Sequence, residues 1–146
     1  MPEVIGIDHI YLSVSDMAVS EAFYDAVLGD ALGFRKSHFT PSGDPHIQYF
    51  NRCFGVVLRP ARASVSHDPF SPGLHHFCLR VETAAEVEEV AEQLRAAGID
   101  ATNAARYPEY APDYVATYFV DPDGIRLEIT NYRQERRDRH DHWDAR

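Results

Sequence analysis

Cysteine is scarce in this 146-residue sequence, which contains only Cys53 and Cys78. Two cysteines do not make a disulfide framework, so a small secreted scaffold held by several disulfides is excluded. The sequence also has no apolar run near the roughly 20 residues that span a bilayer. Its first residues, Met1-Pro2-Glu3, are not typical of a signal peptide. We therefore expect a reduced, cytoplasmic protein that does not contact a membrane.

Basic residues are also few, with 14 lysines and arginines against 23 acidic residues and a formal charge of −9. Nucleic-acid binding needs a basic surface that neutralises phosphates, so we expect no nucleic-acid partner. Apolar residues make up 45% of the chain and charged residues 25%, which is typical of a soluble globular domain. A chain of this length suits one domain that buries about 68% of its unfolded surface.

What the sequence does contain is a repeat. Residues 8–14 (Asp-His-Ile-Tyr-Leu-Ser-Val) and residues 75–81 (His-His-Phe-Cys-Leu-Arg-Val) share the pattern His-apolar-x-Leu-x-Val, in which His9 matches His76. Seven residues after each histidine stands a residue that caps helices, Asp16 or Thr83, followed by a helical pattern. The repeat therefore predicts two copies of a strand that leads into a capped helix.

Each copy continues with alternating and turn-forming residues that predict three more strands. The predicted strands are residues 7–14, 34–39, 46–51 and 53–59 in the first copy, and 74–81, 99–103, 114–120 and 125–130 in the second. The predicted buried stripes are Val19, Ala22, Phe23, Ala26 and Val27 in the first helix, and Val87, Val90, Ala91 and Leu94 in the second. Thr83 and Glu86 predict a capping box at the start of the second helix.

The candidate metal ligands lie on the polar faces of the strands. Alternation places His9 and His76 opposite the apolar faces of their strands, and it does the same for Glu128 in the last strand. The apolar faces must pack on helices, so the three polar side chains converge if the two sheets curve toward each other. Two imidazoles and one carboxylate form the facial triad typical of non-heme iron(II), also used by manganese, zinc or nickel.

The sequence thus predicts an α+β fold of two βαβββ modules, whose curved mixed sheets surround a metal-binding cleft. We expect a single domain over residues 1–146. The first module covers about residues 5–60, the linker 61–73, the second module about 74–131 and a charged tail 132–146.

Each candidate ligand also has a plain structural interpretation. A single strand histidine is more often a hydrogen-bonded polar residue, and a single glutamate such as Glu128 is more often solvated. The matching positions of His9 and His76 favour the metal site. Cys78 is interpreted as a small buried apolar residue, and residues 140–142 (His-Asp-His) as part of a solvated tail.

These motifs resemble the vicinal oxygen chelate superfamily, which includes glyoxalase I, extradiol dioxygenases, fosfomycin-resistance transferases and bleomycin-resistance proteins. The resemblance rests on residues 8–14, on Leu-His-His-Phe at 74–77 and on Tyr-Phe-Val-Asp-Pro-Asp-Gly-Ile-Arg-Leu-Glu at 118–128, and it covers about residues 5–131. It implies one divalent metal ion per chain, with iron(II) or manganese favoured and zinc or nickel as alternatives. It also implies a homodimer, because relatives often pair their chains.

The resemblance also assigns roles to individual residues. The implied metal ligands are His9, His76 and Glu128, and Tyr118 falls where several members carry an active-site tyrosine. We expect Tyr118 and Tyr11 to be the catalytic residues that donate or accept a proton. The candidate substrate-binding residues are Gln48, Phe50, Arg59 and Tyr114.

A departure from glyoxalase I concerns its fourth ligand, a glutamate on the last strand of the first module. Aligning residues 55–59 with residues 124–128 places Arg59 at this position, and arginine does not bind a metal. Lactoylglutathione lyase activity is therefore disfavoured. Arg59 is interpreted either as a contact for an anionic substrate or as a surface arginine paired with a nearby acid.

Other branches of the superfamily differ as well. Fosfomycin transferases carry threonine where this chain has Tyr11, and they bind potassium through a loop with a lysine and serines, which residues 107–114 lack. Bleomycin-binding members lack metal ligands. Extradiol enzymes use two histidines and a glutamate in this order, usually with a second pair of modules and a further catalytic histidine, for which His46 is only a candidate.

We therefore expect a divalent-metal-dependent enzyme that chelates a small oxygenated substrate through two oxygens, with dioxygenase-like chemistry favoured. The alternatives are a metal-dependent lyase or isomerase, and a non-catalytic protein that binds a small molecule and confers resistance to it.

Overall fold

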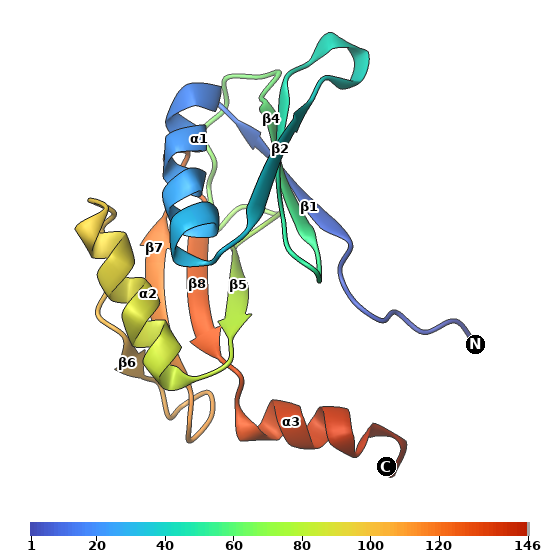
Figure 1. Cartoon of the computed structure of the whole chain (residues 1–146), viewed down its shortest axis with the longest axis vertical. Helices are drawn as coiled ribbons and strands as arrows, with labels where there is room; N and C mark the ends of the chain where they lie inside the picture. The colour runs from blue at the N-terminus through green and yellow to red at the C-terminus, as the bar shows by residue number, and fades with distance from the viewer. Residues whose placement is uncertain (146) are drawn as a thin grey trace. The chain divides into compact units, whose positions relative to one another are not determined.

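The computed structural model describes residues 1–145, whose contacts form two compact units. The N-terminal unit contains residues 1–67 together with Asp121–Asp123, and the C-terminal unit contains residues 68–120 and the chain from Gly124 onward. Each unit holds one four-stranded sheet (Figure 1). Within the described residues, no helix has the length and apolar character needed to cross a membrane.

The N-terminal unit has the predicted order of strand, helix and three strands. Its elements are β1 (His9–Val14), α1 (Met17–Tyr24), a π-helical segment (Asp25–Ala31), β2 (Arg35–Phe39), a 3-10 turn (Pro41–Gly43), β3 (His46–Phe50) and β4 (Gly55–Pro60). The strand order is β1-β4-β3-β2, with β1 parallel to β4 and the other neighbours antiparallel.

The C-terminal unit repeats this plan and adds a helix. Its elements are β5 (His76–Val81), α2 (Ala84–Ala96), β6 (Ala105–Arg106), β7 (Val115–Val120), β8 (Arg126–Asn131), α3 (Gln134–Asp141) and a 3-10 turn (Trp143–Ala145). The strand order is β5-β8-β7-β6, with β5 parallel to β8. The predicted α+β fold of two βαβββ modules with open, curved, mixed sheets is confirmed.

Both helices begin at the predicted residues. The Asp16 carboxylate accepts a hydrogen bond from the backbone N–H of Val19 at 3.0 Å. Thr83 and Glu86 form the full capping box, each side chain accepting from the backbone N–H of the other residue. The predicted stripe of α2 is confirmed, because Val87, Val90, Ala91 and Leu94 are all buried.

The predicted stripe of the first helix is confirmed at Val27 and is otherwise wrong by one position. Val19 is 52% exposed, while the residues that are buried along the helix and the π-helical segment are Ser20, Tyr24, Val27 and Leu28. The reason is Tyr24, which has no exposed surface and donates a hydrogen bond from its hydroxyl to Asp121 at 2.8 Å. A polar contact thus fixes the rotation of this helix, and apolar spacing alone does not reveal it.

The predicted strand at residues 99–103 is also wrong, since the fourth strand of the C-terminal unit is β6, at Ala105–Arg106. The backbone N–H of Thr102 does donate to the carbonyl of Tyr118 at 3.0 Å. The N–H of Ala101, however, turns back to the carbonyl of Ile99 at 2.8 Å, so the segment forms no ladder.

The charged tail contains the helix α3, which has no buried residue. His140 and His142 are exposed, as predicted. Arg133, which precedes α3, is 6% exposed and belongs to the interior of the C-terminal unit.

Candidate functional site

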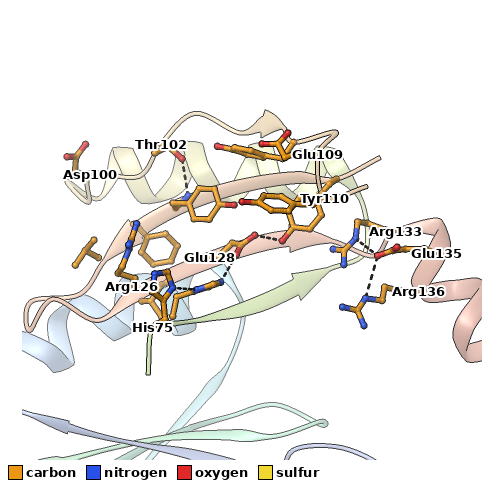
Figure 2. Close-up of a pocket in the computed structure, with 17 residues that line it drawn as sticks. His75, Asp100, Thr102, Glu109, Tyr110, Arg126, Glu128, Arg133, Glu135 and Arg136 are labelled. Atoms are coloured by element: carbon orange, nitrogen blue, oxygen red, sulfur yellow. Dashed lines mark hydrogen bonds and ion pairs between the residues drawn. The ribbon is translucent and has the colours of Figure 1, made fainter. Parts of the chain in front are cut away.

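Glu128 is the centre of the candidate site in the C-terminal unit. It is 3% exposed and lies on β8, where the strand register pairs it with Cys78 on β5 and Tyr118 on β7. Its Oε2 atom lies 3.2 Å from Nε2 of His76, and its Oε1 atom accepts a hydrogen bond from the Tyr114 hydroxyl at 2.5 Å. Figure 2 shows Glu128 in the middle of the pocket, joined to partners on both sides. The structure therefore brings together two predicted metal ligands and two predicted tyrosines.

The two tyrosines next to Glu128 keep their protons at neutral pH. Desolvation, and then the hydrogen bond to Glu128, raises the pKa of Tyr114 above its ordinary value. Desolvation and the negative charge of Glu128 likewise raise the pKa of Tyr118. Both hydroxyl groups are therefore available as hydrogen-bond donors or as weak general acids.

Cys78 is exposed, so the prediction of a buried apolar cysteine is wrong. It shares the polar strand face with Glu128, where the helices do not cover it. Desolvation by its neighbours, followed by the charge of Glu128, raises the pKa of the Cys78 thiol to about 12. The thiol therefore keeps its proton at neutral pH and is a weak nucleophile.

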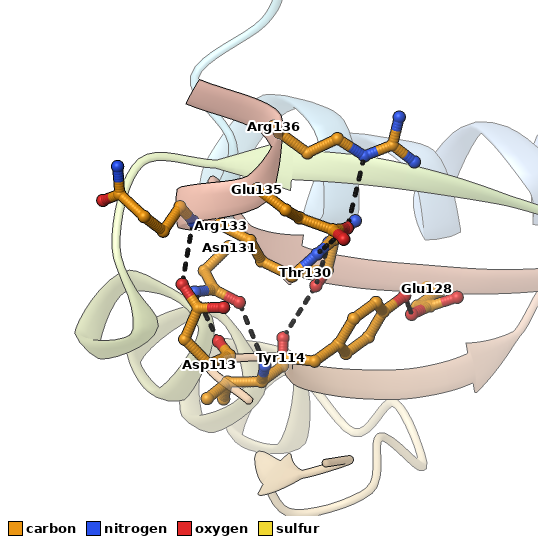
Figure 3. Close-up of polar contacts among 10 residues, drawn as sticks. Asp113, Tyr114, Glu128, Thr130, Asn131, Arg133, Glu135 and Arg136 are labelled. Carbon is orange, nitrogen blue, oxygen red and sulfur yellow. Dashed lines mark hydrogen bonds and ion pairs between the residues drawn. The ribbon is translucent and has the colours of Figure 1, made fainter. Parts of the chain in front are cut away.

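A network beyond the strand holds Tyr114 in place (Figure 3). The Asn131 side chain accepts from the backbone N–H of Val115 at 3.0 Å and donates to the carbonyl of Asp113 at 2.9 Å. The guanidinium of Arg133 lies 4.3 Å from the centre of the Tyr114 ring, a cation–π contact. Sequence analysis missed Asn131 and Arg133 because they follow the repeat, in the region interpreted as the end of the strand and a solvated tail.

His75 is a second residue that sequence analysis did not assign to the site. Its Nδ1 atom lies 2.7 Å from Nδ1 of His76, and the two rings meet edge to face at 5.0 Å. A hydrogen bond to the second nitrogen of a ligating histidine fixes its ring orientation and tautomer. The signal for this role in the sequence was that His75 directly precedes His76.

These residues line a pocket of about 860 Å³ that lies within the C-terminal unit. One wall consists of tyrosine rings from the loop before β7 and from β7 itself, namely Tyr107, Tyr110, Tyr114 and Tyr118. The charged residues along the pocket are Asp100, Glu109, Arg126, Glu128, Arg133, Glu135 and Arg136.

The N-terminal unit gathers the other predicted residues on one face of its sheet. The register places His9, Gly55 and Phe50 in one row across the strands, and Tyr11, Val57 and Gln48 in the next row. The ring of Tyr11 contacts the ring of His9 at 5.3 Å. His9 is exposed, and its Nδ1 atom lies 2.6 Å from the carboxylate of the neighbouring Asp8.

His46, the candidate for a further catalytic histidine, is 4% exposed. Its ring lies between the rings of Tyr11, at 5.8 Å, and Phe39, at 5.0 Å. Its Nδ1 atom contacts the carbonyl of Asp44 at 3.1 Å. These contacts are those of a packed core histidine, although the residue shares its strand face with Gln48.

Gly55 keeps the space beside His9 open. A Cβ atom at this position would lie 3.2 Å from Nε2 of Gln48 and 3.8 Å from Cβ of His9. The first distance is tighter than ordinary contact, so a larger residue would push the Gln48 amide aside. Glycine thus lets His9 and Gln48 occupy neighbouring positions on the face.

The strand registers correct the alignment that placed Arg59 opposite Glu128. His9 pairs with Gly55, whereas His76 pairs with Arg126. Counting from the histidines, the residue of the N-terminal unit that matches Glu128 is therefore Val57. By this count the residue of the N-terminal unit at the level of Glu128 is a valine, whose side chain does not bind a metal.

Arg59 has an ion pair of its own. Its Nη2 atom lies 3.0 Å from the Asp44 carboxylate, which Arg62 also contacts at 3.0 Å. This geometry matches the interpretation of Arg59 as an arginine paired with a nearby acid. Its role in substrate binding stays a prediction.

The donor set of His76 and Glu128 fits a divalent metal ion. Metal–ligand bonds of about 2.0–2.2 Å place neighbouring ligand atoms roughly 3 Å apart, and the nitrogen and oxygen here are 3.2 Å apart. Among residues 1–145, no three His, Cys, Asp or Glu side chains are grouped around one ion position. The third predicted ligand, His9, belongs to the other unit, so the three-ligand site stays a prediction.

Comparison with known proteins agrees with this fold. The sequence model of the Glyoxalase/Bleomycin resistance protein/Dioxygenase superfamily matches residues 6–129. The uncharacterized protein YaeR of Escherichia coli (strain K12) is 29% identical over 128 residues, which cover 84% of this chain and 93% of YaeR.

Two solved structures extend the comparison. The glyoxylase/bleomycin resistance protein/dioxygenase domain from Frankia sp. EAN1pec has 23% identity and a TM-score of 0.72, over 90% of this chain and all of that chain. The fosfomycin resistance protein FosX from Listeria monocytogenes, solved with Mn(II) and 1S,2S-dihydroxypropylphosphonic acid, has 17% identity and a TM-score of 0.69, over 92% of this chain and 98% of that chain. These likenesses show a shared fold. Together with the match over residues 6–129, they show that this chain belongs to the Glyoxalase/Bleomycin resistance protein/Dioxygenase superfamily, the vicinal oxygen chelate superfamily.

Proposed function

We propose that this protein is a divalent-metal-dependent enzyme that binds a small oxygenated substrate through two of its oxygen atoms. The observation that carries the proposal is the buried Glu128 carboxylate, held 3.2 Å from Nε2 of His76 and 2.5 Å from the Tyr114 hydroxyl. A buried carboxylate costs stability unless it is paired. Glu128 is paired with His76 and Tyr114, and a carboxylate beside an imidazole is a donor pair that binds divalent transition metals.

His76 and Glu128 would hold the ion, with His9 as the third ligand. A bound divalent ion would act as a Lewis acid toward the substrate oxygens. Tyr114 keeps Glu128 oriented through its hydrogen bond, and His75 does the same for His76. Tyr118 and Tyr11, as predicted, would donate or accept a proton at the substrate.

The reaction class that we propose is dioxygenase-like, since two histidines and a glutamate are the three-ligand set typical of such chemistry. Iron(II) or manganese is the proposed ion. Val57 supports this choice, because the strand register puts it at the level of Glu128 and a valine does not supply the fourth metal ligand that glyoxalase I uses. A metal-dependent lyase or isomerase is the second candidate, favoured by the position of Tyr118, whose strand register pairs it with Glu128 and puts a hydroxyl proton donor beside the proposed ligand.

Elemental analysis of the purified protein tests the proposal directly. We expect about one divalent ion per chain, lost in His76→Ala and Glu128→Ala and also in His9→Ala, since a missing ligand leaves a bond that the other two do not replace. His140→Ala, a change of an exposed histidine in α3, is the matched control and should retain the metal. Full occupancy in all three ligand variants would refute the metal site.

Substrate screening with and without oxygen then separates the reaction classes. Oxygen uptake that depends on substrate supports the dioxygenase. Turnover under anaerobic conditions supports the lyase or isomerase. A compound that binds without turnover in either condition would identify a binding or resistance protein instead.

Two further proposals concern the assembly and the location of the protein. We propose a homodimer, because the short sheets have open edges that favour pairing between chains; a sedimentation mass of one chain at micromolar concentration would contradict it. We propose a cytoplasmic location, supported by the two free cysteines, Cys53 and Cys78.

A further inference from the structure

Arg126 is a cation of the pocket that has no carboxylate partner among the described residues. It lies two residues before Glu128 on β8, and the strand register pairs it with His76. Its guanidinium lies 5.7 Å from the centre of the Phe70 ring, and the same ring meets His75 at 5.3 Å. Arg126 therefore stands beside the proposed metal ligands, held by an aromatic contact and not by an acid.

The other two arginines of the pocket are already paired with an acid. Nε of Arg133 lies 3.4 Å from the Glu135 carboxylate, and Nε of Arg136 lies 3.8 Å from the same oxygen. Figure 2 shows these three residues at one end of the pocket and Arg126 at the other, next to His75. The positive charge available to a ligand is therefore at the Arg126 end.

Four acids also line the pocket, and they must be weighed against Arg126. Glu128 is engaged by His76 and Tyr114, and Glu135 by the two arginines. Asp100 and Glu109 are exposed, so solvent and salt screen their charges. Arg126 is half-buried, so solvent and salt screen its charge less than they screen the two exposed carboxylates.

A wall of tyrosine rings continues from the position of Arg126. Tyr118 lies on the same strand face, one row away, where rows are about 7 Å apart. Its ring contacts Tyr107 at 5.5 Å, and Tyr110 contacts Tyr114 at 5.3 Å. Tyr110 is 63% exposed and the other three tyrosines are half-buried, so ring surface of the wall is open to a ligand.

From this arrangement we infer that the substrate is a flat, ring-bearing oxyanion, whose carboxylate or phosphonate binds Arg126 while its ring lies on the tyrosine wall. The inference rests on the proposed function, since it names the substrate class of the same site. It also moves the expected anion contact from Arg59, which is paired with Asp44, to Arg126. A guanidinium binds such groups with two parallel hydrogen bonds, which a neutral analogue does not offer.

Binding of simple probes to the full chain tests the inference. Benzoate and phenylphosphonate carry the two candidate anions, and benzamide is the neutral match to benzoate. Dissociation constants are measured by calorimetry on the protein as purified and again after chelation, with metal content determined for each sample. The variants are Arg126→Gln and Arg126→Lys, with Arg136→Gln as the control that removes the same charge from the same pocket.

We expect benzoate to bind more tightly than benzamide, with and without metal. Loss of a charge-assisted hydrogen-bonded pair should weaken benzoate binding by about tenfold or more in Arg126→Gln, less in Arg126→Lys, and by less than about twofold in Arg136→Gln. Tyr110→Ala should weaken benzoate and benzamide equally, because it removes ring contact and no charge. The comparison of benzoate with phenylphosphonate identifies which oxyanion the subsite prefers.

Three results would overturn the inference: no binding of benzoate or phenylphosphonate at millimolar concentration, unchanged affinity for both anions in Arg126→Gln, or an equal loss in Arg136→Gln. These results are separate from those that test the proposed function. If the protein contains metal but its ligand binding does not depend on Arg126, the anion subsite is refuted and the proposed metalloenzyme is retained. If ligand binding depends on Arg126 but the protein takes up no metal, the proposed metalloenzyme is refuted and the anion subsite is retained.

Discussion

The parallel strand pair of the N-terminal unit, β1 and β4, has the same register as β5 and β8 of the C-terminal unit, with different side chains along it. The row of His9 and Gly55 corresponds to the row of His76 and Arg126. The next rows consist of Tyr11, Val57 and Gln48 in one unit, and Cys78, Glu128 and Tyr118 in the other.

The difference shows that the two copies of the repeat keep the same backbone register but carry different polar side chains. Each unit keeps one histidine at the start of its first strand. Only the C-terminal unit carries a carboxylate in the second row, together with a cation in the first. The N-terminal unit has glycine and valine there, which leave space beside His9 and add no charge. Four predictions test this division, from the largest expected effect to the smallest.

The first prediction is that the two cores contribute equally to stability. Leu58 and Ile129 occupy matching positions and have no exposed surface. Each substitution by alanine leaves a cavity and should lower the free energy of unfolding by about 2–5 kcal/mol. Chemical denaturation measures both values. If Leu58→Ala lowers the free energy of unfolding by less than about 1 kcal/mol, the sheet of the N-terminal unit is packed more loosely than the sheet of the C-terminal unit.

The second prediction concerns the second row, and it distinguishes Val57 from Arg59. Glu128→Val gives the C-terminal unit the side chain of its counterpart, and the metal affinity should fall by at least about 100-fold. Adding Val57→Glu to that variant moves the carboxylate to the matching position and should restore part of the affinity. Adding Arg59→Glu should restore none. Melting temperatures serve as the control, because Val57 is 2% exposed and a buried charge lowers stability.

If Arg59→Glu restores metal binding and Val57→Glu does not, the strand register is not the guide to equivalent ligand positions. The alignment that matches Gly55 with Gly124 would then be the correct one after all.

The third prediction concerns the hydrogen bond between Tyr24 and Asp121, which is not one of the features that the two copies of the repeat share. Tyr24→Phe removes the hydroxyl that donates to the buried Asp121 carboxylate. Hydrogen bonds to charged groups contribute about 1.5–3 kcal/mol, so we expect a loss of this size in the free energy of unfolding. Tyr107→Phe is the control, since Tyr107 makes ring contacts and no hydroxyl bond is part of its described surroundings. A neutral effect of Tyr24→Phe would show that Asp121 finds sufficient partners elsewhere.

The smallest expected effects are at the two helix starts. Asp16→Ala and Thr83→Ala should each lower stability by about 1 kcal/mol, the usual contribution of a capping side chain. Thr83→Ser should retain most of it, because the hydroxyl that accepts from Glu86 remains. Thermal unfolding resolves such differences, and a Thr83→Ser variant as weak as Thr83→Ala would assign the effect to the methyl group.

Local chemistry explains which parts of the fold were predictable from the sequence. Capping residues and alternation act over a few neighbours, so the helix starts at Asp16 and Thr83 and the polar face of His76 were predicted correctly. The rotation of α1 depends on Asp121, about a hundred residues away, and no local pattern contains it.

The same limit explains the misplaced equivalence of Arg59. The alignment matched two glycines, Gly55 and Gly124, whereas the register is set by backbone hydrogen bonds between strands. Gly55 already lies within the ladder of β4, while β8 begins two residues after Gly124. A shift of two residues keeps every side chain on its face, so hydrophobic patterning gives no warning of it.

The attachment of α3 has a consequence for the engineering of this protein. The backbone N–H of Gln134 donates to the Asp113 carboxylate at 2.9 Å, next to the tyrosine that holds Glu128. Residues 1–8 form no regular structure and are exposed, so a purification tag or fluorescent label belongs at that end of the chain. Residues 131–136, in contrast, both support Tyr114 and contribute Arg133, Glu135 and Arg136 to the lining of the pocket, so a label attached there would change the site itself.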